Sequence, residues 1–385
     1  MLERMTVRQG QLPKALADVA GRENLGEAVV LSTCMRTEVY AVAEAFHGGV
    51  ADVRNFLAEL GFTAPEDFSD HLYSYYGDAA VAHLFRVACG LDSAVVGESE
   101  VLGQVRNAWK EADAEGVAGP VLRALFRHAV STGRRARTET GIGRGTTSVS
   151  QAAVEMASAR LGGLDGRRIM VLGAGDMGEG MAVALAGAPG VGDVLVANRT
   201  WPKAVSLAAR VGGRAVELAD IGASLESTDV LLTSTGASGV LLDVDDLAAV
   251  MAKRPNRPLL VVDIAVPRDV DPAAGELEGL TLLDMDDLRA FADAGLAGRQ
   301  REVHRAQAIV DEEVARYHAT WTAREMAPLV VALRRRAEAL RSAELDRFAS
   351  QLEGLDADQR HAVESLTQAI LAKVLHEPTV RLKRA

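Results

Sequence analysis

The centre of the chain reads Arg168-Ile169-Met170-Val171-Leu172-Gly173-Ala174-Gly175-Asp176-Met177-Gly178. The first five residues are typical of a short buried strand, and a Gly-x-Gly-x-x-Gly turn then opens a helix rich in Ala and Met. Small residues let the backbone approach a pyrophosphate, and the helix N-terminus stabilises its charge. An ordinary tight turn is the alternative interpretation. The strand-turn-helix context favours a dinucleotide site formed by Gly173, Ala174, Gly175, Asp176, Met177 and Gly178.

Three further apolar runs around this stretch are predicted strands, at Asp193–Ala197, Asp229–Thr233 and Leu259–Asp263. Strands that alternate with helices indicate a parallel sheet covered on both faces, so the fold class is α/β. The second strand ends in Asn198 and Arg199, where an NAD site usually places an acid for the ribose. An arginine there favours a 2′-phosphate, so we expect NADPH as the cofactor.

Length and composition limit the classes of protein that remain. The chain has 385 residues, which corresponds to two to three domains, and 48% hydrophobic with 25% charged residues is ordinary globular usage. A net charge of -11 excludes a globally basic surface for nucleic acid but allows a local patch. Two cysteines cannot form a disulfide framework or a Cys-rich zinc site. With no signal peptide and no apolar run long enough to span a bilayer, we expect a cytoplasmic protein without membrane or metal.

The first 145 residues look mixed α/β and present a cysteine in a polar loop. A strand near Ala28 to Leu31 precedes Ser32-Thr33-Cys34-Met35-Arg36-Thr37, and a second strand, Glu38 to Val42, follows. Arg36 predicts a stabilised thiolate at Cys34. A thiolate attacks an acyl carbon to give a thioester, which a hydride reduces to an aldehyde. The alternative is a small, half-buried Cys, and that structural interpretation is preferred for Cys89 in its apolar helix.

Helical patterns follow at Val81–Val96, Gln104–Ala114 and Leu122–Arg137. His83 lies on the first, where a hydrogen-bonded structural histidine is the alternative to a functional one. The polar residues Ser93, Glu98, Glu100 and Gln104 suit the amine of an amino-acid substrate, or a solvated loop. A basic cluster could meet a phosphate backbone or be a solvated helix face; it contains Arg123, Arg127, Arg134, Arg135, Arg137 and Arg144.

Beyond about residue 285 the pattern becomes helical. Asp286–Thr320 reads as one long helix with a charged face, and Ala327-Pro328 is expected to interrupt it. Apolar residues then recur at helical spacing, at Leu345, Phe348, Leu352 and Leu355, and again at Leu366, Ile370 and Leu375. These helices are too few to bury their own stripes, so pairing with another subunit is expected.

Taken together, these segments resemble glutamyl-tRNA reductase, the first enzyme of the five-carbon route to tetrapyrroles. The match runs in order from about residue 3 to the C-terminus. Its further motifs are Gly90-Leu91-Asp92-Ser93, Val96-Gly97-Glu98, Leu102-Gly103-Gln104, Asn198-Arg199-Thr200, Asp263-Ile264-Ala265-Val266-Pro267-Arg268-Asp269 and Leu375-His376-Glu377-Pro378-Thr379-Val380-Arg381-Leu382.

The resemblance implies a multidomain protein that forms a V-shaped homodimer. Its parts would be a catalytic glutamyl-tRNA-binding domain (1–145), a Rossmann-type NADPH domain (146–285), a spinal helix (286–322) and an all-α dimerisation domain (323–385). The substrate would be glutamyl-tRNA(Glu), and the products glutamate-1-semialdehyde and free tRNA, without metal or flavin. Cys34 would be the nucleophile and His83 important for activity. The glutamyl group would be surrounded by Thr33, Cys34, Met35, Arg36, Ser93, Glu98, Ser99, Glu100 and Gln104.

The sequence departs from the family pattern at three places. Met35 stands where the family usually has Asn, and Ser99-Glu100 replaces the usual Pro-Gln. The family's opening strand has no counterpart before Met1, so we expect Met1 to be an internal start and upstream codons to encode that strand. Without it, an unpaired strand edge would lie beside the nucleophile.

Two other functions are compatible with parts of the sequence. Another NADP-linked dehydrogenase would share the nucleotide fold but leave Cys34-x-Arg36 and Gly90-Leu91-Asp92-Ser93 unexplained. A non-catalytic paralogue that binds tRNA or a pathway partner would be supported only by Met35 and the late start. Glutamate-1-semialdehyde aminotransferase is a candidate partner that could receive the product.

Overall fold

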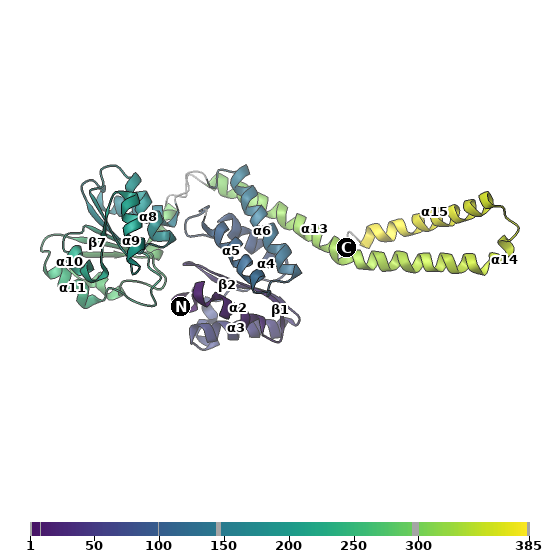
Figure 1. The fold of residues 1–385 in the computed structure, drawn as a ribbon, viewed down its shortest axis with the longest axis horizontal. Coiled ribbons are helices and arrows are strands. Elements are labelled where there is room, and N and C mark those ends of the chain that lie inside the picture. Colours follow the sequence, from purple (N-terminus) through teal and green to yellow (C-terminus); the bar gives the residue numbers. More distant parts are fainter. Residues whose placement is uncertain (1, 8, 99, 144–147, 295–299, 383–385) are drawn as a thin grey trace. The chain divides into compact units, whose positions relative to one another are not determined.

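The computed structural model describes residues 2–7, 9–98, 100–143, 148–294 and 300–382. Two compact units divide the chain, Met1–Val310 and Asp311–Ala385. The first unit contains a β-hairpin with its surrounding helices, followed by a parallel α/β sheet, and the second is helical (Figure 1).

The N-terminal part of the first unit is organised on an antiparallel hairpin. Strands β1 (Leu25–Ser32) and β2 (Thr37–Ala43) pair so that Ser32 lies opposite Thr37, which leaves residues 33–36 as the tip. The side chains of β1 are almost continuously buried because helices α2 and α5 contact it. The helices of this part are α1 (Leu2–Met5), α2 (Leu12–Ala20), α3 (Phe46–Gly61), α4 (Asp78–Cys89), α5 (Glu100–Ala114) and α6 (Pro120–Glu139).

Strand β2 has an open outer edge: among the described residues it pairs only with β1. A groove follows this edge and is lined by the exposed aromatic side chains of Phe46, Tyr73, Tyr75 and Tyr76. Whether an upstream strand fills it stays a prediction.

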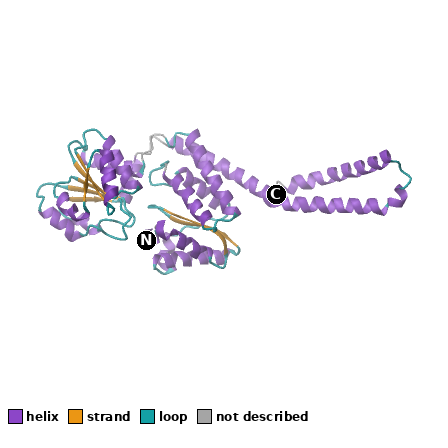
Figure 2. Ribbon diagram, in the orientation of Figure 1, coloured by secondary structure: helices purple, strands orange, loops and turns teal. Residues whose placement is uncertain are grey.

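The second part of the first unit is a six-stranded parallel sheet in the order β5-β4-β3-β6-β7-β8 (orange in Figure 2). Its strands are β3 (Arg168–Leu172), β4 (Asp193–Ala197), β5 (Arg214–Val216), β6 (Val230–Thr233), β7 (Leu259–Asp263) and β8 (Leu280–Leu283). This is the doubly wound order, whose switch point for nucleotides lies between β3 and β6. The predicted bounds of β3, β4 and β7 are confirmed, and β6 begins one residue later than predicted.

Both faces of this sheet are buried, which explains its unbroken apolar strands. Alternate residues such as Ile169 and Val171 pack with one set of helices, α7 (Val149–Leu161), α8 (Asp176–Gly187), α9 (Trp201–Val211) and α12 (Met285–Ala294). Their neighbours Met170 and Leu172 pack with α10 (Ile221–Leu225) and α11 (Val244–Ala252) on the opposite face. The α/β class and the multidomain architecture predicted from the sequence are therefore confirmed.

Helix α13 runs from Gln300 to Arg347 and contains Pro328, so the predicted interruption at Ala327-Pro328 is wrong. A proline removes one backbone hydrogen-bond donor and crowds one helical turn. The helix nevertheless continues on both sides of Pro328, over 48 residues in all.

The second unit comprises the later part of α13, then α14 (Ala349–Leu352) and α15 (Ala357–Leu382). Helix α15 runs back along α13 (Figure 1), and the Nη1 of Arg341 donates a hydrogen bond to the Thr367 hydroxyl at 3.1 Å. Leu366, Ile370 and Val374 remain 54 to 63% exposed, as the expected pairing with another subunit requires. No described helix is long and apolar enough to cross a membrane.

Candidate active site

Cys34 lies at the tip of the β1–β2 hairpin, in a turn that Thr33 holds closed. The Thr33 amide donates to the Arg36 carbonyl at 2.8 Å, and the Thr33 hydroxyl accepts hydrogen bonds from the amides of Met35 and Arg36 at 3.1 and 3.2 Å. A threonine side chain that satisfies two amides of its own loop fixes the loop conformation. The position of Cys34 is therefore set by the backbone around it.

A narrow cavity opens beside the Cys34 loop and collects most of the predicted substrate residues. It is lined by Thr33, Cys34, Met35, Arg36, Ser93, Glu98, Glu100 and Gln104, with Ala94, Val101, Val149 and Met177. These residues come from the hairpin tip, the segment after α4, the start of α5, and the first helices of the nucleotide-binding part. Ser99 lies outside the described residues, and His83 lines the neighbouring groove instead.

The Cys34 thiol is protonated at neutral pH, so the predicted thiolate is wrong for the free protein. Burial, followed by the charges of Glu98 and Glu100, raises the pKa of Cys34 to about 12 against the smaller, opposite effect of Arg36. The two carboxylates share the cavity with the sulfur, and the guanidinium of Arg36 pairs with Glu38 at 3.1 Å and donates to the Asp92 carbonyl.

The two glutamates of the cavity have different environments. Glu98 is buried, and its two carboxylate oxygens accept from the amides of Glu100 and Val101 at 2.9 and 3.1 Å, which caps α5. The hydroxyl of Ser93 also donates to Glu98, at 3.4 Å. Burial, followed by the charges of Glu98 and Asp176, raises the pKa of Glu100 to about 7. Glu100 can therefore exchange a proton near neutral pH.

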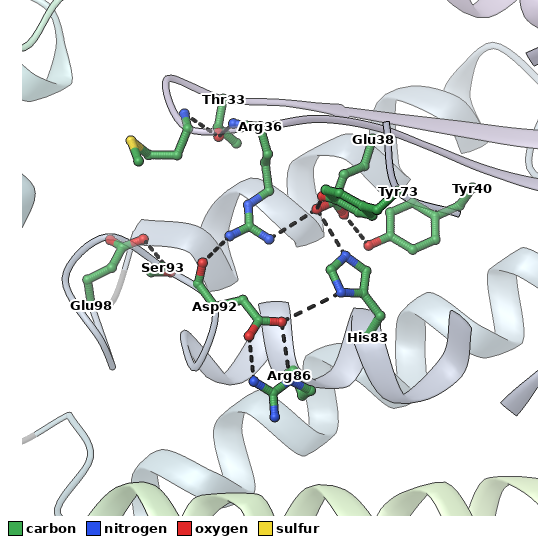
Figure 3. A network of polar contacts seen from close by, with 11 residues as sticks. Thr33, Arg36, Glu38, Tyr40, Tyr73, His83, Arg86, Asp92, Ser93 and Glu98 are labelled. Carbon is green, nitrogen blue, oxygen red and sulfur yellow. Dashed lines mark hydrogen bonds and ion pairs between the residues drawn. The ribbon is translucent and has the colours of Figure 1, made fainter. Parts of the chain in front are cut away.

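His83 belongs to a buried polar network next to the cavity (Figure 3). The carboxylate of Glu38 lies at its centre and accepts hydrogen bonds from four side chains, which are Arg36 (3.1 Å), Tyr73 (2.6 Å), His83 (3.0 Å) and Tyr40. On the other side of the imidazole, Nδ1 lies 3.6 Å from Asp92 Oδ2, and Arg86 holds Asp92 at 2.6 Å.

The network fixes the charges of its members. Burial alone would raise the pKa of Glu38, but the hydrogen bond from His83 and the charge of Arg36 lower it to about 2. The pKa of Asp92 is also lowered to about 2, because the bonds from His83 and Arg86 outweigh its burial. Burial opposes the charge of His83, yet the bonds to Asp92 and Glu38 raise its pKa to about 9.

The sequence prediction missed Glu38, Tyr73 and Asp92 as members of the site. Glu38 gave a local signal: it follows Arg36 by two residues and shares a strand face with Tyr40, and such a buried carboxylate needs partners. Tyr73 gave none, because its loop is placed only by the folded chain.

The basic cluster on α6 is not a single solvated face. Arg137 points inward and donates to the carbonyls of Ala88 at 2.9 Å and Glu98 at 2.7 Å, so it ties α4 to the segment before α5. Arg123 pairs with Asp113 and Arg135 with Glu139. Arg127 and Arg134 are exposed, and Arg144 lies outside the described residues.

The glycine turn after β3 has the geometry that a dinucleotide requires. A Cβ at Gly178 would lie 2.1 Å from the Gly173 carbonyl oxygen, whereas one at Gly175 would meet nothing within 4 Å. The close contact at Gly178 lets helix α8 pack against the turn, and the open space at Gly175 leaves room for a pyrophosphate at the start of α8. The hydroxyl of Ser234 is buried beside this turn with no partner among the described residues, and the Ala174 amide donates to Asn198 at 3.2 Å. Arg199 is exposed at the end of β4.

Cys89 is fully buried, and burial raises the pKa of its thiol to about 12, as befits a structural residue. In the part of the chain that the structure describes, no three His, Cys, Asp or Glu side chains are grouped as metal ligands would be.

Comparison with known proteins identifies the family. Residues 1–140 match the family model of the glutamyl-tRNA(Glu) reductase N-terminal domain, residues 155–291 that of shikimate / quinate 5-dehydrogenase, and residues 305–385 that of the glutamyl-tRNA(Glu) reductase dimerisation domain. The dehydrogenase match indicates a nicotinamide cofactor, and the last match gives the chain a dimerisation domain.

Full-length relatives agree with these matches. The glutamyl-tRNA reductase of Syntrophotalea carbinolica is 40% identical over 383 residues, which cover 100% of this chain and 86% of that protein. That of Bacillus subtilis is 38% identical, covering 99% and 84%. The solved glutamyl-tRNA reductase from Methanopyrus kandleri is 32% identical, covers 100% of this chain and 95% of its own, and has a TM-score of 0.46. The chain belongs to the glutamyl-tRNA reductase family, oxidoreductases of the first step of tetrapyrrole synthesis.

Proposed function

We propose that this enzyme reduces the glutamyl ester of tRNA(Glu) to glutamate-1-semialdehyde with NADPH, through a thioester on Cys34. The observation that carries the proposal is the cavity at the hairpin tip. It places one thiol, one guanidinium and two carboxylates around a single small volume, next to a helix that follows a dinucleotide turn. A glutamyl ester presents one ammonium group, one side-chain carboxylate and one electrophilic ester carbon, which these groups complement.

The substrate itself would activate the nucleophile. Glu98 and Glu100 disfavour the Cys34 thiolate, and an ammonium group bound between them would cancel that effect. Glu100, whose pKa is about 7, is the proposed acceptor of the thiol proton. The thiolate then attacks the ester carbon, the bond from that carbon to the ribose oxygen breaks, and the oxygen leaves with a proton. The product of this step is the glutamyl thioester of Cys34 and free tRNA.

The residues of the glycine turn fit the cofactor, and one of them, Met177, lines the cavity. Backbone amides at Gly173 to Gly178 would hold its pyrophosphate, and Asn198 and Arg199 its ribose and 2′-phosphate. When bound, NADPH supplies the hydride that turns the thioester into the aldehyde and releases the Cys34 thiolate. Met177 of this turn lines the cavity with Cys34, which supports the delivery of hydride to that carbon.

Three partners complete the proposal. The tRNA body would contact exposed arginines of α6, and the apolar stripes of α15 would pair with a second copy of the chain. Transfer of the semialdehyde to an aminotransferase stays a prediction. A binding-only paralogue is less well supported, because it would need neither the dinucleotide turn nor a thiol in the cavity.

The test is a single-turnover assay with charged tRNA(Glu). The protein is mixed with radiolabelled glutamyl-tRNA(Glu) and NADPH, and the semialdehyde is detected as its hydrazone. Formation of labelled semialdehyde in amounts stoichiometric with protein supports the proposal. Release of glutamate alone, with NADPH unchanged, would show that the chain hydrolyses the ester and does not reduce it.

A further inference from the structure

The side chain of Glu38 joins His83 to Arg36 and to two tyrosines. It is 6% exposed, and its Oε1 accepts from Arg36, Tyr73 and His83 while Oε2 accepts from Tyr40 (Figure 3). Arg36, one of its four donors, also lines the cavity beside Cys34. Glu38 does not line that cavity itself, so an effect on the reaction would have to act through its partners.

The guanidinium of Arg36 is held at two of its five N–H donors. One donates to Glu38 and another to the backbone carbonyl of Asp92, and the side chain is 9% exposed. Both acceptors lie on the same network, because the Asp92 carboxylate and Glu38 flank the imidazole of His83. Arg36 also lines the cavity, so its remaining donors are available there to a carboxylate of the substrate.

The imidazole of His83 has carboxylate oxygens at both nitrogens. Nε2 lies 3.0 Å from Glu38 Oε1, and Nδ1 lies 3.6 Å from Asp92 Oδ2. The first contact is a hydrogen bond and the second an ion-pair contact, and a doubly protonated ring favours both. Tyr75 stacks on the imidazole with 4.7 Å between the ring centroids, and Tyr73 makes an edge contact with 5.4 Å between the centroids. These two contacts keep the imidazole in place.

The charged groups around the His83 ring come from four segments. Glu38 lies on β2, Asp92 follows α4, and Arg86 on α4 bonds to Asp92 at 2.6 Å. Arg36 approaches from the hairpin tip, and the tyrosines come from the segment before α4. The two carboxylates closest to the ring both favour its charged form.

We infer that Glu38 is a positioning residue for the reaction: its carboxylate, with Asp92, holds His83 as a cation and fixes the Arg36 guanidinium at the wall of the Cys34 cavity. In this arrangement His83 is a structural cation between two carboxylates and not a proton acceptor. The inference rests on the proposed function only for its effect on substrate; the charge state of His83 is independent of that function and is supported by the two carboxylates beside the ring.

The experiment compares the full-length wild-type chain with Glu38→Gln, and with Glu59→Gln as the matched control. Glu59 also pairs with an arginine, Arg22, but at an exposed position away from the cavity. Nitrogen-15 NMR of the histidine rings, assigned with His83→Gln, reports the protonation of His83 against pH. Single-turnover transfer of label from glutamyl-tRNA(Glu) to the protein, without cofactor, reports acylation, and the affinity for uncharged tRNA(Glu) reports folding.

In the wild-type chain both ring nitrogens of His83 should stay protonated through neutral pH. In Glu38→Gln its titration should fall by roughly one unit or more, because one opposite charge at hydrogen-bond distance is lost. Acylation should slow roughly tenfold to a hundredfold, the range for a charged hydrogen bond. Affinity for uncharged tRNA should not change, and Glu59→Gln should match the wild type in all three measurements.

Two results would overturn the inference. The first is a wild-type His83 that titrates near the value of a free histidine, which needs no variant to observe. The second is a folded Glu38→Gln chain that is acylated at the wild-type rate. If the wild-type chain accepts no glutamyl group at all, the proposed function fails instead, and the titration of His83 still decides its charge.

Discussion

The Cys34 thiol shares its cavity with one cationic side chain, Arg36, and with two carboxylates, Glu98 and Glu100. Burial and the carboxylates of Glu98 and Glu100 disfavour the thiolate, and the opposite effect of Arg36 is smaller. In the proposed mechanism the thiol therefore stays neutral until a cationic substrate enters. A neutral thiol is also less readily oxidised, since the thiolate is the reactive form.

The first prediction concerns Glu100. Changing Glu100→Gln removes a negative charge next to the sulfur, so the pKa of Cys34 should fall and alkylation at fixed pH should accelerate. The rate of iodoacetamide labelling of Cys34, followed by peptide mass spectrometry across pH 6 to 10, measures the shift. Glu115→Gln, an exposed glutamate just beyond the same helix, serves as control. Identical labelling profiles for Glu100→Gln and wild type would show that this carboxylate does not act on the thiol.

The second prediction concerns Arg199. The exposed guanidinium at the end of β4 should bind the 2′-phosphate, so NADPH should be preferred over NADH. Arg199→Ala should raise the apparent KM for NADPH by roughly tenfold, as expected for a lost charged hydrogen bond, and leave that for NADH nearly unchanged. Lys203→Ala, an exposed cation on α9, is the control. Equal use of both cofactors by the wild-type chain would contradict this assignment.

The resemblance, more than the spacing, predicted the residues that line the cavity, and neither predicted their charge states. Cys34 and Arg36 lie in one turn, and Ser93, Glu98, Glu100 and Gln104 lie in one later segment, which only the folded chain brings to that turn. The thiolate prediction failed because it considered Arg36 without the burial of the thiol and the charges of Glu98 and Glu100. The partners Tyr73 and Asp92 come from other segments, and only tertiary structure brings them to Glu38.

At the scale of elements, the site depends on how β2, the loop before α4 and α4 itself are joined. Glu38 connects β2 to Tyr73 and His83, and Asp92 follows the left-handed Gly90 that ends α4. Arg137 of α6 binds the carbonyls of Ala88 and Glu98 on either side of this turn. The amphipathic pattern predicted α6 but not the inward direction of Arg137, because a charged residue at the boundary of a helix face can point either way.

The third prediction is a pH dependence of stability that originates in this network. The pKa of His83 is raised to about 9. The stabilisation of the folded state by the His83 charge should therefore be complete below about pH 6.5 and disappear as pH rises through 9. The pKa values of Glu38 and Asp92 are lowered to about 2. The stabilisation by these two carboxylates should therefore be complete above about pH 4.5 and disappear as the pH falls toward 2. The difference in Tm between wild type and His83→Gln, measured from pH 5 to 10, should be largest at the acidic end. A difference that grows toward pH 10 would have the wrong sign.

At the scale of the whole molecule, an acidic protein must bind a polyanion. The net charge of -11 repels tRNA at long range, so contact depends on local cations. Of the predicted arginine cluster, Arg127 and Arg134 remain exposed, whereas Arg137 has a structural role. The exposed apolar stripes of the C-terminal helices were predicted from periodicity. The single helix predicted over Asp286–Thr320 is wrong, because its first residues form α12, which packs on the parallel sheet, and α13 begins at Gln300 and continues through Pro328.

The fourth prediction is that the affinity for tRNA falls steeply with salt. If Arg127 and Arg134 each contact a phosphate, replacing both by Ala should reduce the slope of log K against log salt by roughly one per contact. Replacing Arg334 and Arg335 of α13, which are also exposed, gives the control. Fluorescence anisotropy with labelled uncharged tRNA(Glu) measures the slope. An unaltered slope in the Arg127, Arg134 variant would return these residues to an ordinary solvated surface.

The most direct measurement is intact-protein mass spectrometry after acid quenching of the enzyme with glutamyl-tRNA(Glu) and no cofactor. We predict the added mass of one glutamyl group, located by peptide analysis at Cys34 and lost on addition of NADPH with formation of the semialdehyde. Cys34→Ala should carry no adduct. Cys89→Ala should form it normally, although the lost core volume will lower its stability. An adduct on another residue, or semialdehyde formation by Cys34→Ala at a comparable rate, would contradict the proposed mechanism.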